Sequence, residues 1–457
     1  MAGILDRLMQ LNTKINTFIW GPYMLAAFLL IGIYFTVRTG FFQFAKVGLW
    51  FRHTLLSCFQ RGGARETRDK EAISPFQAMT TALASSIGTG NIAGVATAIV
   101  LGGPGAVFWM WVSAIFGMMT NFAENVLGSH FRYKDKDGKW VGGPMIYMER
   151  GLSQKWLGVV FAFCTIFGSL GMGNLTQSNS MAAAMQAGFS LPPFVTGIAA
   201  AVLVGMIIMG GIKRIARVTE QLVPMMAILY VAGGLVLLCL NANRILPALS
   251  SIFTDAFSFQ AAGAGALGFG ISRAMRYGIA RGVFTNEAGL GSSVLAHSAS
   301  DVREPVVQGM WGIFEVFADT IVMCSITALI ILTSGVYEAT DLTGSALTIA
   351  AFSTRFGSFG VLFVSVSTVL FAFCTLVGWS YYGERAASYI FGQKSALYYR
   401  VVYIFCIFIG AISSLDLVWS LSDTFNGMMA VPNLIAVALL SGTVIKLTKD
   451  YLKSNRL

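Results

Sequence analysis

Two very long stretches without a charged residue constrain this chain more than any other feature. Residues 72–123 form a run of 52 uncharged residues, and residues 156–212 form a run of 57. Each run is more than twice the ~20 residues that a helix needs to cross the hydrocarbon of a bilayer. Only 11% of the chain is charged, whereas 56% is hydrophobic. The sequence therefore predicts an all-α polytopic membrane protein, and excludes a disordered chain, a disulfide scaffold and a soluble multidomain enzyme.

Helix-breaking residues divide the chain into eleven predicted transmembrane helices. The first apolar run, 17–37, is too long for a signal-peptide core and lacks a small-residue cleavage site, so we interpret it as a span. Glycine and proline divide the 52-residue run at 102–105 and the 57-residue run at 188–193. Later spans are expected at 218–240, 256–280, 309–334, 357–386, 398–414 and 418–445. One lone helix therefore leads a set of ten.

The placement of lysine and arginine predicts the orientation, because cytoplasmic loops retain positive charge. With the amino terminus outside, 27 of the 31 basic residues fall in inner segments, namely 38–70, 132–155, 213–217, 273–303, 385–400 and 446–456. The exceptions are Arg7, Lys14, Arg244 and Arg355. We therefore expect an outer amino terminus and a cytoplasmic carboxyl terminus. The net charge of +10 then reflects topology and does not indicate a nucleic-acid partner.

The residues that usually build metal or catalytic sites are few and scattered. Six cysteines stand singly without CxxC spacing, and none of the three histidines has a second ligand at i+4. No nucleophile and base pair indicates covalent catalysis. We therefore expect neither an enzyme nor an organic cofactor, and no obligate protein partner is indicated.

The second predicted span contains a glycine-rich polar interruption at its centre. Gly88 and Gly90 stand among serine, threonine and asparagine, and irregular backbone at this depth survives only where it lines a cavity or is buried in protein. A break would free the amides of Thr89 and Gly90 for a carboxylate at a helix N-terminus. The freed carbonyls of Ala84 and Ile87 would suit a hard cation such as sodium. The alternative is that small residues simply allow close helix packing.

A second glycine-rich tract occupies residues 263–270, in the sixth helix of the set of ten. It includes Gly265, Ala266 and Gly268. Interrupted helices at corresponding positions of two halves are typical of transporters built from inverted repeats. Glycine packing is again the alternative.

Polar residues in two other spans are candidates to face the interruption. Asn174 and Gln177 share a helix face at i,i+3, although bonding between helices would also explain them. Thr375 and Trp379 share a face at i,i+4, where a hydroxyl suits a sodium ion and an indole could wall a small pocket. Core packing is the alternative for that pair.

Acidic residues within spans are functional candidates by default. Glu315 and Asp319 are the charges of the eighth span and could serve cation coupling or a proton relay. Pairing with a basic residue such as Arg281 or Arg385 is an equal alternative. We interpret Glu124, near the inner interface, as structural.

Several motifs resemble the alanine or glycine:cation symporter family, the sodium:alanine symporters. Residues 102–117 combine a glycine pair, Phe-Trp-Met-Trp and a closing glycine. Similar family motifs are Ser-Pro-Phe-Gln at 74–77, Ser-Ile-Gly-Thr-Gly-Asn-Ile-Ala-Gly at 86–94, Gly-Gly-Ile-Lys-Arg at 210–214 and the stretch 280–291. The resemblance covers essentially the whole chain.

The resemblance implies the leucine-transporter-type fold, with two inverted five-helix repeats after one extra helix. We divide the chain accordingly at 1–70, 71–243 and 244–457. It further implies a substrate carboxylate on the amides of Thr89 and Gly90, with sodium held by the carbonyls of Ala84 and Ile87 and by Thr375. The substrate contacts carried over are Gln177, Asn174, Trp379 and the tract that includes Gly265, Ala266 and Gly268.

Asn91 matches a position that can ligate another sodium in related folds, so it joins Glu315 and Asp319 as a possible coupling residue. Ala266 stands where many members have an aromatic residue, which leaves the size of the pocket open.

The expected function is sodium-coupled import of a small neutral amino acid, alanine or glycine, across a bacterial or archaeal cytoplasmic membrane. The alternatives are the same fold carrying glutamine or another neutral amino acid, with protons as a possible coupling ion, and a channel or membrane-embedded enzyme. Asymmetric basic loops and two broken helices favour a transporter over a pore.

Overall fold

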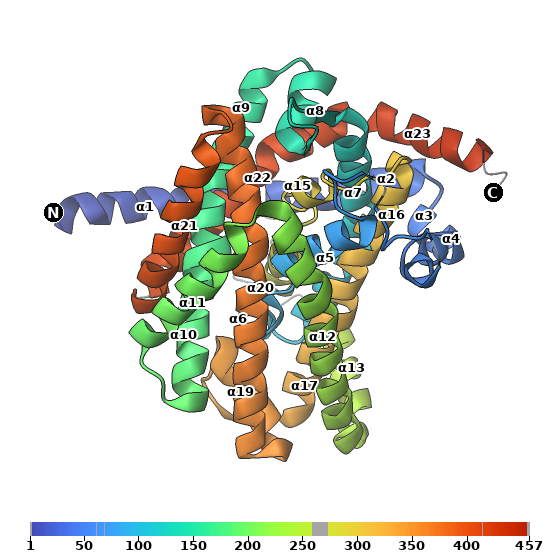
Figure 1. The fold of residues 1–457 in the computed structure, drawn as a ribbon. Helices are drawn as coiled ribbons and strands as arrows, with labels where there is room; N and C mark the ends of the chain where they lie inside the picture. The colour runs from blue at the N-terminus through green and yellow to red at the C-terminus, as the bar shows by residue number, and fades with distance from the viewer. Residues whose placement is uncertain (1, 61, 68, 258–272, 414, 455–457) are drawn as a thin grey trace.

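A computed structural model describes residues 2–60, 62–67, 69–257, 273–413 and 415–454. Most of these residues are helical, and the helices form a bundle (Figure 1). The sheet within these ranges is one short antiparallel hairpin, in which Tyr133 pairs with Val141. The hairpin and α8 lie at one end of the bundle, which we call the α8 end; α19 lies at the other, the α19 end (Figure 1).

The first part of the chain contains short helices, a broken helix and one long helix. Its segments are α1 (Ala2–Ile19), α2 (Pro22–Arg38), α3 (Phe42–Ala45), α4 (Val47–His53), η1 (Leu55–Phe59), α5 (Pro75–Ser86), η2 (Thr89–Asn91), α6 (Ala93–Gly102) and α7 (Gly105–Phe131).

The middle part begins with the hairpin and continues as helices. Its segments are β1 (Tyr133–Lys134), β2 (Trp140–Val141), α8 (Pro144–Gly151), α9 (Lys155–Leu170), the π-helical η3 (Gly171–Leu175), α10 (Thr176–Phe189), α11 (Pro193–Ile208), α12 (Gly211–Leu240) and α13 (Ala242–Ala256).

The last part contains a second π-helical segment and the longest helix. Its segments are α14 (Arg273–Asn286), α15 (Val294–His297), α16 (Pro305–Val316), the π-helical η4 (Phe317–Cys324), α17 (Ser325–Ser334), α18 (Val336–Ala339), α19 (Gly344–Phe356), α20 (Ser358–Phe391), α21 (Ser395–Ile412), α22 (Leu415–Leu439) and α23 (Ser441–Ser454).

The breaks expected at glycine and proline clusters are confirmed. Gly103 adopts a φ of 77° between α6 and α7, a conformation that glycine adopts without a Cβ clash. The chain also leaves helix between Phe189 and Pro193, where α10 ends and α11 begins.

Seven helices within the described ranges are long and apolar enough to cross a membrane, or eight with the α22–α23 pair, which bends by 57°. The bundle is thus that of a multi-pass membrane protein, whereas the count of eleven stays a prediction. The broken helix α5–α6 and the 16-residue α11 fall below the length of a regular span.

Most of the predicted span 256–280 lies outside the described residues, so that span stays a prediction. Helix α13 ends at Ala256, and the described part of α14 runs from Arg273 to Asn286. The carbonyl of Arg273 lies near Gly102, at the far end of α7 from Arg132. The grouping of 273–303 had predicted that Arg273 joins the basic residues of the α8 end, and the position of Arg273 contradicts this prediction.

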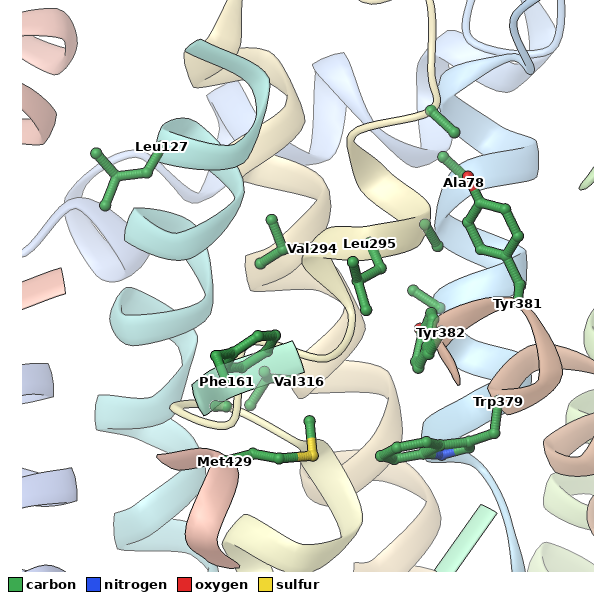
Figure 2. Close-up of a cluster of buried hydrophobic side chains, with 14 of the residues drawn as sticks. Ala78, Leu127, Phe161, Val294, Leu295, Val316, Trp379, Tyr381, Tyr382 and Met429 are labelled. Carbon is green, nitrogen blue, oxygen red and sulfur yellow. The ribbon is translucent and has the colours of Figure 1, made fainter. Parts of the chain in front are cut away.

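The core surrounds α7, which packs along α14, α16 and α2. Large buried side chains fill the space between these helices and α20, and Figure 2 shows Leu295, Trp379 and Tyr382 among them. Close approach depends on small residues, because a Cβ on Gly278 of α14 would lie 2.3 Å from the Ala106 carbonyl oxygen of α7.

Gly278→Ala should therefore destabilise the protein by about 1–3 kcal/mol, because the new methyl group would push α14 away from α7. Thermal unfolding of the purified protein in detergent, followed by tryptophan fluorescence, measures the effect. Gly48→Ala in α4 is the matched control, since nothing lies within 4 Å of the Cβ it would add. Equal melting temperatures for Gly278→Ala and wild type would contradict this account of the packing.

Candidate functional site

The predicted interruption is present between α5 and α6. Helix α5 begins with a capping box, in which the Ser74 hydroxyl accepts from the Gln77 N–H and the Gln77 side chain accepts from the Ser74 N–H, both at 3.1 Å. The helix ends at Ser86, Gly88 adopts an extended conformation, and α6 starts at Ala93. The span therefore consists of two helices joined by an irregular segment.

The interruption frees two carbonyl groups from their helical partners. The N–H of Gly88, which would bond to the Ala84 carbonyl in a regular helix, donates to Asn91 Oδ1 at 3.0 Å. The N–H of Asn91, the regular partner of Ile87, bonds to the Gly88 carbonyl at 3.3 Å. The carbonyls of Ala84 and Ile87 thus lack their regular helical donors, and their binding of a cation stays a prediction.

Two predicted residues lie directly against the interruption. Thr375 of α20 faces Gly88, where a Cβ would lie 2.6 Å from the Thr375 hydroxyl oxygen. Gln177 of α10 receives hydrogen bonds at its Oε1 from the Thr89 hydroxyl at 3.1 Å and the Thr89 N–H at 3.4 Å. The amide predicted for a carboxylate therefore already faces an acceptor oxygen, which an incoming carboxylate could replace.

Asn91 connects the interruption to the π-helical segment η4. Its Nδ2 donates to Asp319 Oδ1 at 2.7 Å, and Thr320 donates to the other oxygen of Asp319 at 2.8 Å. Asn286, the last residue of α14, donates to the Thr320 hydroxyl at 3.1 Å. Two of the three possible coupling residues, Asn91 and Asp319, therefore lie in contact.

A second interruption follows α14, at a position that the sequence analysis missed. Between Asn286 and Val294 the chain leaves helix, and positive φ angles occur at Glu287 (58°), Gly289 (92°) and Gly291 (75°). The stretch belongs to the motif 280–291, which the predicted topology had assigned to an inner segment. The available signal was the acidic residue Glu287 just before the alternating glycines Gly289 and Gly291.

The second interruption brings unpredicted residues to the first. Phe284 and Thr285 of α14 lie against Gly90. Glu287 Oε1 accepts a hydrogen bond from the Trp379 indole at 3.0 Å, and Ser292 donates to Glu287 Oε2 at 2.5 Å. The predicted wall residue Trp379 is therefore held by a carboxyl group from the other broken helix.

The remaining predicted site residues are Asn174 and the glycine-rich tract. Asn174 donates to the Tyr403 carbonyl of α21 at 2.8 Å, so its amide group faces away from the interruption. Asn174 lies within the π-helical turn η3, whereas Gln177 lies in α10, and the wider turn changes the face that each side chain presents. Gly265, Ala266 and Gly268 lie outside the described residues.

Glu315 and Glu124 are fully buried and have polar partners without a positive charge. Glu315 contacts Asn121 and His297, whereas Arg281 lies 3.7 Å from Asp423. The alternative in which Arg281 pairs with Glu315 or Asp319 is therefore wrong. Within the described ranges, no three side chains of histidine, cysteine, aspartate or glutamate gather as a metal-binding group.

The interruption is approached by a cavity from the α19 end. The cavity has a volume of about 590 Å³ and is lined by Gly94 of α6, Asn179 of α10, Arg281 of α14 and Asp423 of α22, among others. Gly94 lies only three residues beyond Asn91. The arrangement suits a small molecule that reaches the broken helices from this end.

Several contacts join segments of the chain at the α8 end. The guanidinium of Arg132 bonds to the carbonyls of Ser298, Ser300 and Val302. Beside it, Lys134 lies 2.7 Å from Asp69, and this hydrogen bond lowers the pKa of the Asp69 carboxyl. The connection after α15 is thereby fastened to the end of α7.

Sequence comparison finds relatives along almost the entire chain. The model of the sodium:alanine symporter family matches residues 5–457. The chain is 46% identical to the sodium/alanine symporter AgcS of Methanococcus maripaludis, covering 98% of both proteins. It is 38% identical to the probable sodium/glutamine symporter GlnT of Bacillus subtilis, covering 96% of this chain and 90% of that one.

Structure comparison agrees with the predicted fold type. MhsT, solved in complex with L-phenylalanine, aligns with a TM-score of 0.60 at 15% identity, covering 84% of this chain and 93% of MhsT. The two proteins share a fold, that of the leucine-transporter type. These relatives are transporters, which confirms that the chain is a transporter and not an enzyme. The chain belongs to the sodium:alanine symporter family and is a cation-coupled amino-acid transporter.

Proposed function

We propose that the chain is a sodium-coupled symporter that imports alanine or glycine by alternating access. The observation that carries the proposal is the interruption at residues 87–92, where two carbonyls lack their helical partners, the Thr375 hydroxyl lies against Gly88 and the Thr89 amide faces an acceptor. Carbonyl and hydroxyl oxygens are the ligands that a hard monovalent cation prefers, and a helix N-terminus attracts a carboxylate. One broken helix can therefore bind both solutes.

The substrate would bind with its carboxylate on the amides of Thr89 and Gly90, displacing the Gln177 oxygen. Gln177 could then turn its amide group to the same carboxylate. Trp379, fully buried and held by Glu287, would limit the space for a side chain. Such a wall suits alanine or glycine.

Sodium would bind between the carbonyls of Ala84 and Ile87 and the hydroxyl of Thr375. The ion would join the broken helix to α20 and order the segment that carries Thr89 and Gly90. Coupling then follows from a higher substrate affinity in the sodium-bound state, with no covalent step. Asn91 and Asp319, which are in contact, are candidates for a further coupled cation.

The topology that we propose has eleven spans, with two inverted five-helix repeats at 71–243 and 244–457 after one extra helix. The α8 end carries the basic hairpin and α23, so we place it in the cytoplasm of a bacterium or archaeon, with the amino terminus outside. The cavity at the α19 end would then open outward.

Purified protein in liposomes should accumulate labelled alanine or glycine when sodium is higher outside than inside. Uptake should fall to the background of empty liposomes when potassium replaces sodium or when the gradient is collapsed with a sodium ionophore. Accumulation that is unaffected by the sodium gradient would contradict sodium symport.

Gly88→Ala should weaken sodium binding, because the added methyl group would lie 2.6 Å from the Thr375 hydroxyl oxygen and displace it. Loss of one ligand to an ion costs about 1.5–3 kcal/mol, so the sodium concentration for half-maximal uptake should rise roughly tenfold or more. Gly48→Ala in α4 is the matched control, since nothing lies within 4 Å of its Cβ position and it lines neither the interruption nor the cavity. Wild-type sodium dependence in a monodisperse Gly88→Ala protein would refute this sodium site.

A second candidate function is transport of glutamine or another neutral amino acid on the same fold. The identity to the probable sodium/glutamine symporter favours it. Unlabelled amino acids that compete with alanine uptake would separate the two, since glutamine competing better than alanine would support the second candidate. Uptake driven by a pH gradient without sodium would instead indicate proton coupling.

A further inference from the structure

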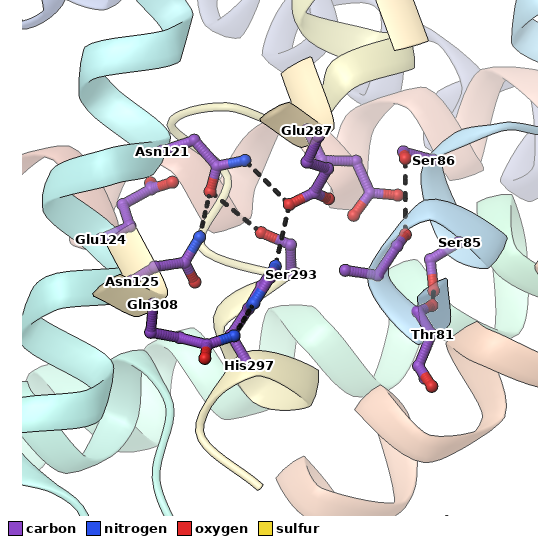
Figure 3. A network of polar contacts seen from close by, with 12 residues as sticks. Thr81, Ser85, Ser86, Asn121, Glu124, Asn125, Glu287, Ser293, His297 and Gln308 are labelled. Atoms are coloured by element: carbon purple, nitrogen blue, oxygen red, sulfur yellow. Dashed lines mark hydrogen bonds and ion pairs between the residues drawn. The ribbon is translucent and has the colours of Figure 1, made fainter. Parts of the chain in front are cut away.

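One oxygen of the buried Glu315 carboxyl has no hydrogen-bond donor. Glu315 lies on α16 with no exposed surface, and its Oε2 accepts from Asn121 Nδ2 at 3.0 Å and faces His297 Nε2 at 3.1 Å. No donor reaches its Oε1. Figure 3 shows Asn121, Ser293 and His297 in the surrounding network. An ionised carboxylate with a bare oxygen would be strongly disfavoured at such a position.

The partners of His297 determine that its ring is neutral. Ser300 donates to Gln308 Oε1 at 3.0 Å, which leaves the Gln308 amino group to donate to His297 Nδ1. A histidine that accepts at Nδ1 carries its single proton on Nε2. This proton points to Glu315, so His297 supplies a hydrogen bond and no positive charge.

Ser293 can only accept a hydrogen bond from Glu315. It lies beside the Glu315 carboxyl, but its one proton goes to Asn121 Oδ1 at 3.1 Å. Asn125 also donates to that oxygen, at 2.8 Å, which fixes the orientation of the Asn121 amide. An acceptor beside a carboxyl oxygen is favourable only if that oxygen carries a proton.

Within the described residues, the elements around Glu315 bring no positively charged side chain to its carboxyl group. The titratable groups near it are Glu124 on α7, Glu287 after α14, His297 on α15, Asp319 on η4 and Tyr382 on α20. Helix α5 has no titratable side chain. On α4 and α23, which also pack against α16, His53 contacts Tyr451, and Arg52, Lys446 and Lys449 are exposed.

We propose that Glu315 is a proton-binding site, and that here it is a neutral carboxylic acid whose proton lies on Oε1, the oxygen without a hydrogen-bond partner, and turns toward Ser293. Ser293 in turn donates to Asn121, and Asn121 donates back to Glu315 Oε2. From Glu315 the hydrogen bonds continue through His297 and Gln308 to Ser300, whose carbonyl accepts from Arg132 at the α8 end. The inference goes beyond sodium symport and does not depend on it.

Infrared spectroscopy of purified protein, free of sodium and substrate, tests the proposal. The carbonyl band of protonated carboxylic acids is separate from the band of carboxylates. The area of the first band is therefore proportional to the number of neutral acids. Glu315→Gln should reduce this area by one carboxylic acid, while its amide oxygen still accepts from Asn121 and His297. Glu304→Gln, an exposed glutamate at the start of the same helix, should leave the area unchanged.

A second variant tests the partner of the proton. Ser293→Ala should keep the band area and shift the Glu315 component to higher frequency, because the acid loses its acceptor. An area that is unchanged by Glu315→Gln would overturn the protonated state. An unshifted band in Ser293→Ala would overturn the assignment of Ser293. Neither result depends on transport activity, so a failed proton site and a failed sodium symporter would be distinguished.

Discussion

The structure depends on one constraint, which is that the hydrocarbon of a bilayer offers no hydrogen bonds to a polypeptide backbone. Any segment that leaves helix must find partners within the protein. At the first interruption those partners are Asn91 and Gln177, which bond to the N–H groups of Gly88 and Thr89. The polar residues that are unusual for a membrane helix are thus concentrated where the backbone is open, and the same opening provides the groups for a ligand.

The two broken helices hold one another in place. Thr285 of α14 lies against Gly90, and the Trp379 indole of α20 donates to Glu287 in the second interruption. Asn91 and Asn286 both reach the Asp319 and Thr320 pair of η4. A cation or substrate that orders one interruption would therefore change the packing of the other. Alternating access requires such a connection between distant parts of the bundle.

The buried carboxyl groups are a second unusual feature of this membrane protein. Glu124, Glu287, Glu315 and Asp319 are fully buried, and their hydrogen-bond partners within the described residues include no lysine or arginine. Buried charges are retained in proteins only when they are paired, bind ions or bind protons. The scarcity of charge in this chain thus has two meanings: it marks the membrane spans, and it makes each remaining acid a candidate for ion or proton binding.

The sequence by itself determined the properties that depend on local composition. Uncharged runs required membrane helices, the glycine and proline clusters at 102–105 and 188–193 ended them, and Gly88 and Gly90 among hydroxyl residues identified the first interruption. These properties depend on residues close in the chain, so a linear pattern contains them.

Only the tertiary structure decided which distant groups meet. The second interruption at 287–293, the turn of Asn174 toward α21, and the contacts of Glu315 with Asn121 and His297 depend on helix packing and on the π-helical turns η3 and η4. A single extra residue in a helical turn rotates every later side chain to another face, and no pattern of residue types revealed where those turns fall.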